Sequence, residues 1–221
     1  MAKIRNELEF EAAVDRCKVR AKRELTDILF ASKTPSRKPV VLRGLYAMTY
    51  STYEGFCRDS IAIWADFVSG QGIPLSKCNY GVLCAKLKQE MLNISGTDSS
   101  KALSKVIQQL VLGERNVQLD RQHVSNTNSN LNSKILESFV YFFSSETSTF
   151  IDEHRFIDDL LLQRRNKIVH GVLDGETYLE ITPDDVADAH ERVLTIIEIF
   201  SDGLSNAVSL KQYLRGTLGP V

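Results

Sequence analysis

Residues 163–171, with the sequence QRRNKIVHG, hold the side chains best suited to chemistry in this chain. Arg165 offers a guanidinium that can bind a phosphate through two parallel hydrogen bonds. His170 offers an imidazole, which exchanges protons near neutral pH and can act as general acid or base. Asn166 precedes His170 by four residues, so on a helix the two side chains share one side. These groups together suit the cleavage of a phosphodiester without a metal ion.

Such cleavage of RNA needs a base for the 2′-hydroxyl proton, an acid for the leaving oxygen, and cations for the charge that develops on the phosphate. One chain supplies a single His170, which cannot be base and acid at once. A symmetric dimer would bring two copies together. The helix that carries residues 163–170, called the motif helix below, is therefore predicted to lie at a homodimer interface. The spacing alone also fits an ordinary helix end, where Arg, Lys and His are common.

Helices must position this stretch, because apolar residues recur with helical periodicity along most of the chain. The second helix carries a wide apolar and aromatic stripe and is expected to be the central core helix. Gly171 is placed to end the motif helix, and Thr182 followed by Pro183 marks the start of the last helix. The segment 114–124 is ambiguous. The expected helices are 4–32, 40–69, 79–93, 101–112, 131–143, 150–170 and 183–214.

Residues 173–181 contain Asp174 and Gly175 between two short alternating runs, a pattern typical of a small hairpin. The expected fold class is therefore all-α, a helical bundle with at most one small hairpin before the last helix. We expect a single domain over 1–221, with an N-terminal helix at 4–32 and a core bundle at about 40–214.

The chain has 27 basic and 28 acidic residues, so its net charge gives no signal for binding to nucleic acid or to an anionic membrane. A local cluster of basic residues is compatible with this balance. The four cysteines show no CxxC pair and no zinc-ligand spacing. The start of the chain lacks the apolar core of a signal peptide, and no later segment could span a bilayer. We expect a cytoplasmic protein with no membrane partner.

Other kinds of catalytic site find no support. The four histidines, His123, His154, His170 and His190, show no HxxxH or HExxH spacing, so no metal site is predicted. The motifs GxSxG, GxGxxG and GxxxxGK[ST] are absent from the sequence. No cofactor is expected.

Residues 165–171 (RNKIVHG), near the end of an apolar helix, resemble the Arg-Asn-x-x-x-His signature of the HEPN superfamily. Residues 53–56 (YEGF), within the long second helix, resemble the aromatic-Glu-Gly-Phe element of its MAE-type branch, also called RiboL-PSP-HEPN. The order of the helices, with a long early helix and the motif on a late one, fits as well. The resemblance covers roughly residues 40–205 and implies a HEPN-like helical bundle.

The resemblance implies a metal-independent endoribonuclease, acting as a toxin or phage-defence effector, with an active site composed across a homodimer. Arg165 and His170 would be the catalytic pair, and Asn166 the polar residue that orients them. Glu54 would be a supporting acidic group. Arg164 also fits an Arg-x5-His spacing, but the helical wheel points it inward, so we assign the motif arginine to Arg165.

The implied partners are an RNA substrate and a second copy of the chain. Motifs of an attached nucleotidyltransferase, helicase or kinase domain are absent, so any antitoxin or defence-system protein would be a separate chain. The alternative is a non-catalytic HEPN-like helical module, which would use the same bundle to dimerise or to bind a nucleotide, RNA or a partner.

Overall fold

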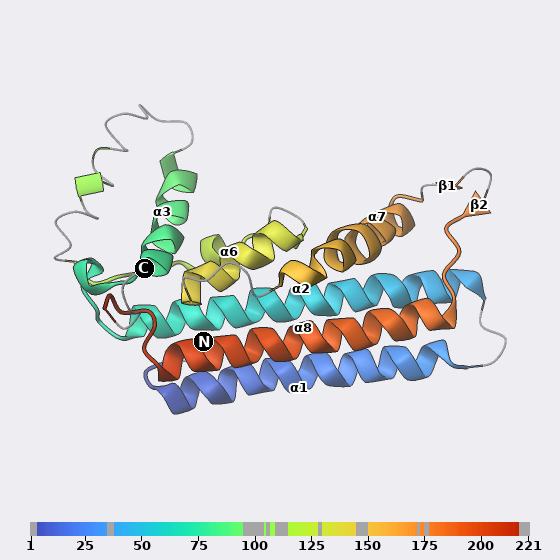
Figure 1. The fold of residues 1–221 in the computed structure, drawn as a ribbon, viewed down its shortest axis with the longest axis horizontal. Helices are drawn as coiled ribbons and strands as arrows, with labels where there is room; N and C mark the ends of the chain where they lie inside the picture. Colours follow the sequence, from blue (N-terminus) through green and yellow to red (C-terminus); the bar gives the residue numbers. More distant parts are fainter. Residues whose placement is uncertain are drawn as a thin grey trace.

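The computed structural model describes residues 4–34, 38–94, 104, 107–108, 115–127, 130–144, 150–171, 173–174 and 177–216. These ranges are mostly helical, which confirms the all-α fold class. Three long helices lie side by side, and shorter helical segments cover one side of them (Figure 1). The long helices are α1 (Glu7–Ser32), α2 (Pro39–Gly70) and α8 (Pro183–Ser209).

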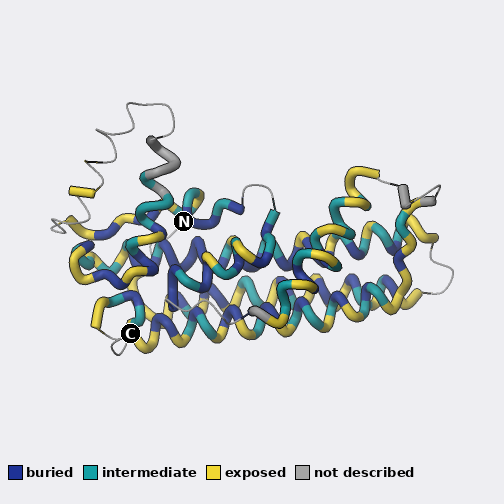
Figure 2. Tube along the Cα trace, turned by 45° about the horizontal axis from the view of Figure 1, so that its top comes forward, coloured by how far each residue is buried: buried dark blue, intermediate teal, exposed yellow. Residues whose placement is uncertain are grey.

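Helix α2 is the centre of the fold, as its aromatic stripe predicts. Pro39 occupies its first turn, where a missing N–H costs no helical hydrogen bond. Its 32 residues contact α1 and α8 on one side and the shorter helices on the other. Figure 2 shows the buried trace gathered along the interior of this arrangement. The large buried side chains of α2 include Tyr46, Tyr50, Tyr53, Phe56, Trp64 and Phe67.

Helix α8 begins as predicted but ends earlier than predicted. The Thr182 hydroxyl accepts the Asp185 N–H, and the Asp185 carboxylate accepts the Thr182 N–H, which forms a capping box. At the other end Lys211 adopts φ +53°, and the Gln212 N–H reaches back to the Ala207 carbonyl at 2.8 Å. This termination normally uses glycine, so the sequence carried no signal for a stop near residue 209.

The shorter helices are α3 (Tyr80–Ile94), α5 (Arg121–Val124) and α6 (Ser133–Ser144). Helix α3 crosses the end of α6 closely, because a Cβ at Gly81 would lie 2.6 Å from the carbonyl oxygen of Phe142. The ambiguous segment 114–124 contains α5. The helix expected at 101–112 lies outside the described residues, apart from positions 104, 107 and 108.

The helix predicted over 150–170 is wrong as a single α-helix. The chain forms a short 3-10 turn η2 (Ile151–Glu153), a π-helix η3 (Phe156–Leu162) and then α7 (Gln163–Val169). The Asp158 carboxylate accepts the N–H and the hydroxyl of Ser133, at 2.8 and 2.6 Å, and so caps α6. The Tyr46 hydroxyl donates to the Leu160 carbonyl at 2.9 Å. Hydrogen bonds of this kind, to residues of other helices, favour the wider turn of the π-helix. The helical periodicity of the sequence gives no sign of them.

The predicted hairpin is present between α7 and α8. Its strands β1 (Leu173–Asp174) and β2 (Thr177–Tyr178) pair antiparallel, with Leu173 opposite Tyr178. Asp174 pairs with Thr177, and the predicted turn residues 175 and 176 lie outside the described residues. The hairpin follows the end of α7 and stands above the first turns of α2 (Figure 1).

Among the described residues, no helix has both the length and the apolar character needed to cross a bilayer.

Candidate active site

Arg165 is held in place by neutral groups. Its Cζ lies 5.2 Å from the centre of the Tyr50 ring, a cation–π contact. Its Nη1 donates to the Asn166 side-chain oxygen at 2.9 Å and to the Asn130 side-chain oxygen at 3.4 Å. No carboxylate within the described ranges forms an ion pair with this guanidinium. Its charge is therefore held in position without a direct carboxylate partner among the described residues.

Tyr50 connects Arg165 to Glu54. Its hydroxyl accepts the Leu131 N–H at 2.7 Å. Burial, and then the nearby Glu54 carboxylate, raise the pKa of Tyr50 above its ordinary value, so the phenol keeps its proton across the physiological range. Glu54 itself is half-buried and accepts the Thr127 hydroxyl at 2.8 Å. Tyr50 and Glu54 are four residues apart on α2, so they face the same side of that helix.

The loop between α5 and α6 joins α2 to α7. We call its described residues 125–127 and 130–132 the strap. The Thr127 hydroxyl donates to Glu54 and the Leu131 N–H donates to the Tyr50 hydroxyl. The Asn130 side-chain oxygen accepts a hydrogen bond from Arg165. The polar composition of this segment predicts a loop, and it does not reveal that Thr127 reaches Glu54 on α2 or that Asn130 reaches Arg165 on α7. Tyr50 could have been found from its spacing to Glu54.

Arg164 points to a different part of the molecule. Its Nη1 lies 2.6 Å from the Asp185 carboxylate in the capping box of α8, and its Cζ lies 6.0 Å from the Tyr46 ring centre. These contacts tie α7 to the start of α8. Of the two adjacent arginines, Arg164 is thus paired with a carboxylate, whereas Arg165 has no such partner within the described part of the chain.

The Arg164–Asp185 pair predicts a pH dependence of stability. Burial acts to raise the pKa of Asp185, but hydrogen bonds from Thr182 and Arg164 outweigh it and hold this pKa below its ordinary value. The pair therefore stabilises the fold above the unfolded-state pKa of about 4 and loses this effect as the pH falls through the lower folded-state pKa. At neutral pH the melting temperature of wild type should be higher than that of Asp185→Asn, and this difference should shrink below about pH 4.

Thermal melts at several pH values test this expectation. Asp184→Asn is the matched control, because Asp184 lies exposed in the same first turn. Its melting temperature should stay near that of wild type at neutral pH. A difference for Asp185→Asn that persists undiminished at the lowest pH would contradict the assigned pair.

His170 closes α7 and faces solvent. Its N–H donates to the Asn166 carbonyl at 3.0 Å, and Gly171 follows with φ +63°, which confirms the predicted glycine termination. Within the described ranges no hydrogen bond or ion pair of the His170 imidazole is present, and none joins it to Arg165. Asn166 contacts both residues, through its side chain to Arg165 and its backbone to His170.

Helix α7 is a surface helix. It contains no fully buried residue, and Val169 next to His170 is 55% exposed. The four residues predicted for the site are therefore only partly brought together. Arg165 and Asn166 touch, Glu54 reaches them through Tyr50 and the strap, and His170 stands apart on an open face.

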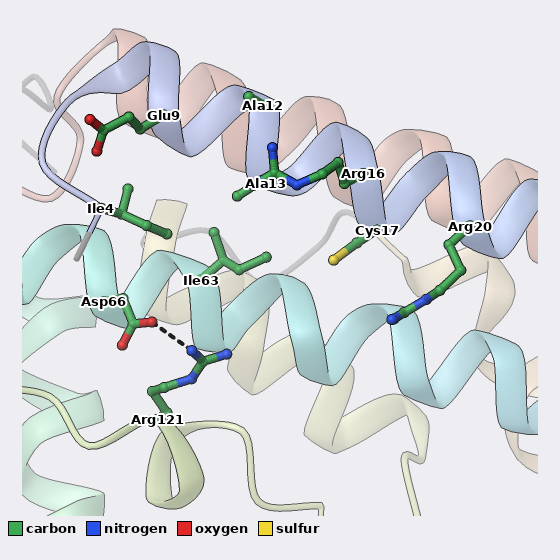
Figure 3. Close-up of a pocket in the computed structure, with 10 residues that line it drawn as sticks. All are labelled: Ile4, Glu9, Ala12, Ala13, Arg16, Cys17, Arg20, Ile63, Asp66 and Arg121. Atoms are coloured by element: carbon green, nitrogen blue, oxygen red, sulfur yellow. Dashed lines mark hydrogen bonds and ion pairs between the residues drawn. The ribbon is translucent and has the colours of Figure 1, made fainter. Parts of the chain in front are cut away.

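A groove of about 600 Å³ lies between α1, α2 and α5, and none of the predicted site residues lines it (Figure 3). Two of its arginines are paired with carboxylates: Arg121 with Asp66 at 2.8 Å, and Arg20 with Asp59 at 2.5 Å. Among the described residues, no group of three or more His, Cys, Asp or Glu side chains is placed to hold a metal ion.

The model of the RiboL-PSP-HEPN family matches residues 18–206, so the chain belongs to this HEPN-type family. No curated protein and no solved structure matches the sequence. The family match spans Glu54 on α2, the strap and the whole of α7, which are the elements that build the arrangement around Arg165.

Proposed function

We propose that the protein is a metal-independent endoribonuclease whose active site forms between two copies of the chain. One observation carries the proposal. In a chain of the RiboL-PSP-HEPN family, the same short helix holds Arg165 in place with no acidic partner among the described residues, and ends in the exposed His170. A fixed cation and a free imidazole are the groups that 2′-hydroxyl attack on a phosphodiester requires.

The chemistry follows from these groups. His170 of one protomer takes the proton of the 2′-hydroxyl, whose oxygen attacks the adjacent phosphorus. Arg165 binds the phosphate oxygens and stabilises the negative charge that develops on them. The bond to the 5′-oxygen breaks, and the second protomer's copy of this histidine supplies a proton to that oxygen. The products are a 2′,3′-cyclic phosphate and a 5′-hydroxyl.

Two features support a site shared by two chains. Within the described part of one chain no hydrogen bond or ion pair joins the side chains of His170 and Arg165, and the outer face of α7 is open around Val169. A second copy placed on this face about a twofold axis would bring both His170 side chains and both Arg165 side chains to one phosphate. Glu54, through Tyr50 and the strap, would then support Arg165 from behind without touching the substrate.

The setting we propose is that of a toxin or phage-defence effector, in keeping with the family implied by the sequence motifs. Its restraint would come from a separate chain, an antitoxin or another component of the defence system.

A nuclease assay with chelator tests the proposal. We expect the purified protein to cut single-stranded RNA equally well with and without EDTA, and to leave 2′,3′-cyclic phosphate ends that mass spectrometry of the fragments detects. Dimerisation or ligand binding with no RNA cleavage would instead favour a non-catalytic helical module. Cleavage that EDTA abolishes would contradict the metal-independent mechanism.

A further inference from the structure

Tyr178 is an aromatic side chain that the fold leaves in solvent. It is 57% exposed at the end of β2, whereas Tyr46, Tyr50 and Tyr53 on α2 are buried. The guanidinium of Arg43, near the start of α2, lies over its ring at 4.9 Å from the ring centre. One face of the ring is thus covered by a cation. More than half of the residue's surface remains exposed, so the ring offers apolar area to a ligand.

This exposed ring lies close to His170. Leu173 follows His170 by three residues, which places their Cα atoms within about 10 Å. Tyr178 pairs directly with Leu173 across the hairpin, a separation of about 5 Å between Cα atoms. Figure 1 shows the hairpin at the end of α7, above the first turns of α2. A short single-stranded segment of RNA bound at His170 can therefore reach the Tyr178 ring.

A ring of this kind fits an unpaired nucleobase. Bases of single-stranded RNA stack on exposed aromatic rings and on arginine planes, and the contact tolerates any base because every base has a π-face. Arg43 stiffens the platform by its cation–π contact and adds a positive charge beside the phosphates that flank the stacked base.

We propose that Tyr178, backed by Arg43, is a stacking site for one nucleobase of the RNA chain next to the cleaved phosphate. The proposal rests on the function proposed above, since it names the part of the substrate that the hairpin binds. It identifies the substrate as RNA with at least one unpaired base near the cleaved bond.

Binding of a fluorescein-labelled, unstructured RNA oligonucleotide tests the proposal, with every variant made in a His170→Ala background so that no cleavage intervenes. Tyr178→Ala should weaken binding by about tenfold, and Tyr178→Phe should keep wild-type affinity because it retains the ring. Tyr178→Leu should bind like Tyr178→Ala, since it keeps apolar surface but lacks the π-face.

The chain supplies a matched control in Tyr80. This tyrosine is 63% exposed and has Arg215 over its ring at 5.4 Å, but it lies on α3 and far from α7 along the structure (Figure 1). Tyr80→Ala should bind RNA as the parent does. An oligonucleotide that carries one abasic ribose at the stacked position should bind the parent protein about tenfold more weakly and should not weaken Tyr178→Ala further.

Several outcomes would overturn the proposal. They are unchanged RNA binding by Tyr178→Ala, equal weakening by Tyr80→Ala, or full affinity of Tyr178→Leu. Loss of the dimer in Tyr178→Ala, measured by analytical ultracentrifugation, would assign the ring to a protein interface instead. If the active protein cleaves RNA but cleavage does not depend on Tyr178, the stacking proposal alone is rejected. If RNA binding depends on Tyr178 but no cleavage occurs, the catalytic proposal is rejected and the stacking proposal stands.

Discussion

His170→Ala is expected to lower the rate of RNA cleavage by about 10²- to 10⁴-fold, the contribution of a positioned general acid or base. The substitution removes the only imidazole on α7, and this imidazole has no partner among the described residues that depends on it. Folding and melting temperature should therefore stay near those of wild type. Initial rates on a labelled RNA, with circular dichroism of both proteins, give the measurement.

His123→Ala is the matched control for this prediction. His123 is a partly exposed histidine on α5, hydrogen-bonded to Asp120 in its own turn. Its replacement should leave cleavage unchanged. Equal cleavage by wild type and His170→Ala would contradict the catalytic assignment.

A mixed dimer separates a two-histidine site from a one-histidine site. One protomer keeps His170, the other carries His170→Ala, and two different affinity tags isolate the heterodimer. If one histidine takes a proton while its partner gives one, the heterodimer should be nearly as inactive as the doubly substituted dimer. A heterodimer with half of the wild-type activity would show that one histidine suffices. It would leave the role of His170 itself intact.

The three long helices could be predicted because each buries one wide apolar face, and such a face leaves a periodic record in the sequence. The ends of two helices could also be predicted, because they depend on a residue next to them in the sequence. Thr182 caps the start of α8, and Gly171 adopts the positive φ that ends α7 after His170. The fold class and the hairpin follow from these signals.

The arrangement around Arg165 could be predicted only in part. The residue types were visible, but their partners lie far away along the chain: Asn130 is 35 positions from Arg165, and Thr127 is 73 positions from Glu54. Such contacts depend on how the strap packs on α2. The π-helical turn before α7 has the same origin, since bonds from Ser133 and Tyr46 favour it. Turns of this kind are frequent at functional sites.

Arg165→Ala is expected to lower cleavage by about 10²- to 10³-fold, the usual cost of losing one preorganised group that stabilises a developing oxyanion. The structure separates this effect from a loss of stability. Arg165 contacts neutral groups only, and its removal leaves no buried carboxylate unpaired within the described ranges. The melting temperature should therefore change little. The readout is the initial rate at saturating RNA, compared with the binding affinity of the same variant.

Arg164→Ala is the control that the chain itself provides, because it removes an equal charge from the adjacent position. Its loss leaves the half-buried Asp185 without its cation and weakens the join between α7 and α8, so the melting temperature should fall by several degrees. The folded fraction should still cleave RNA.

Arg165→Lys tests the geometry, since it keeps the charge but loses the planar guanidinium that stacks on Tyr50 while its nitrogens reach Asn130 and Asn166. Its cleavage rate should lie nearer to that of Arg165→Ala than to that of wild type. If Arg164→Ala abolished cleavage without loss of stability while Arg165→Ala kept full activity, the motif arginine would be Arg164.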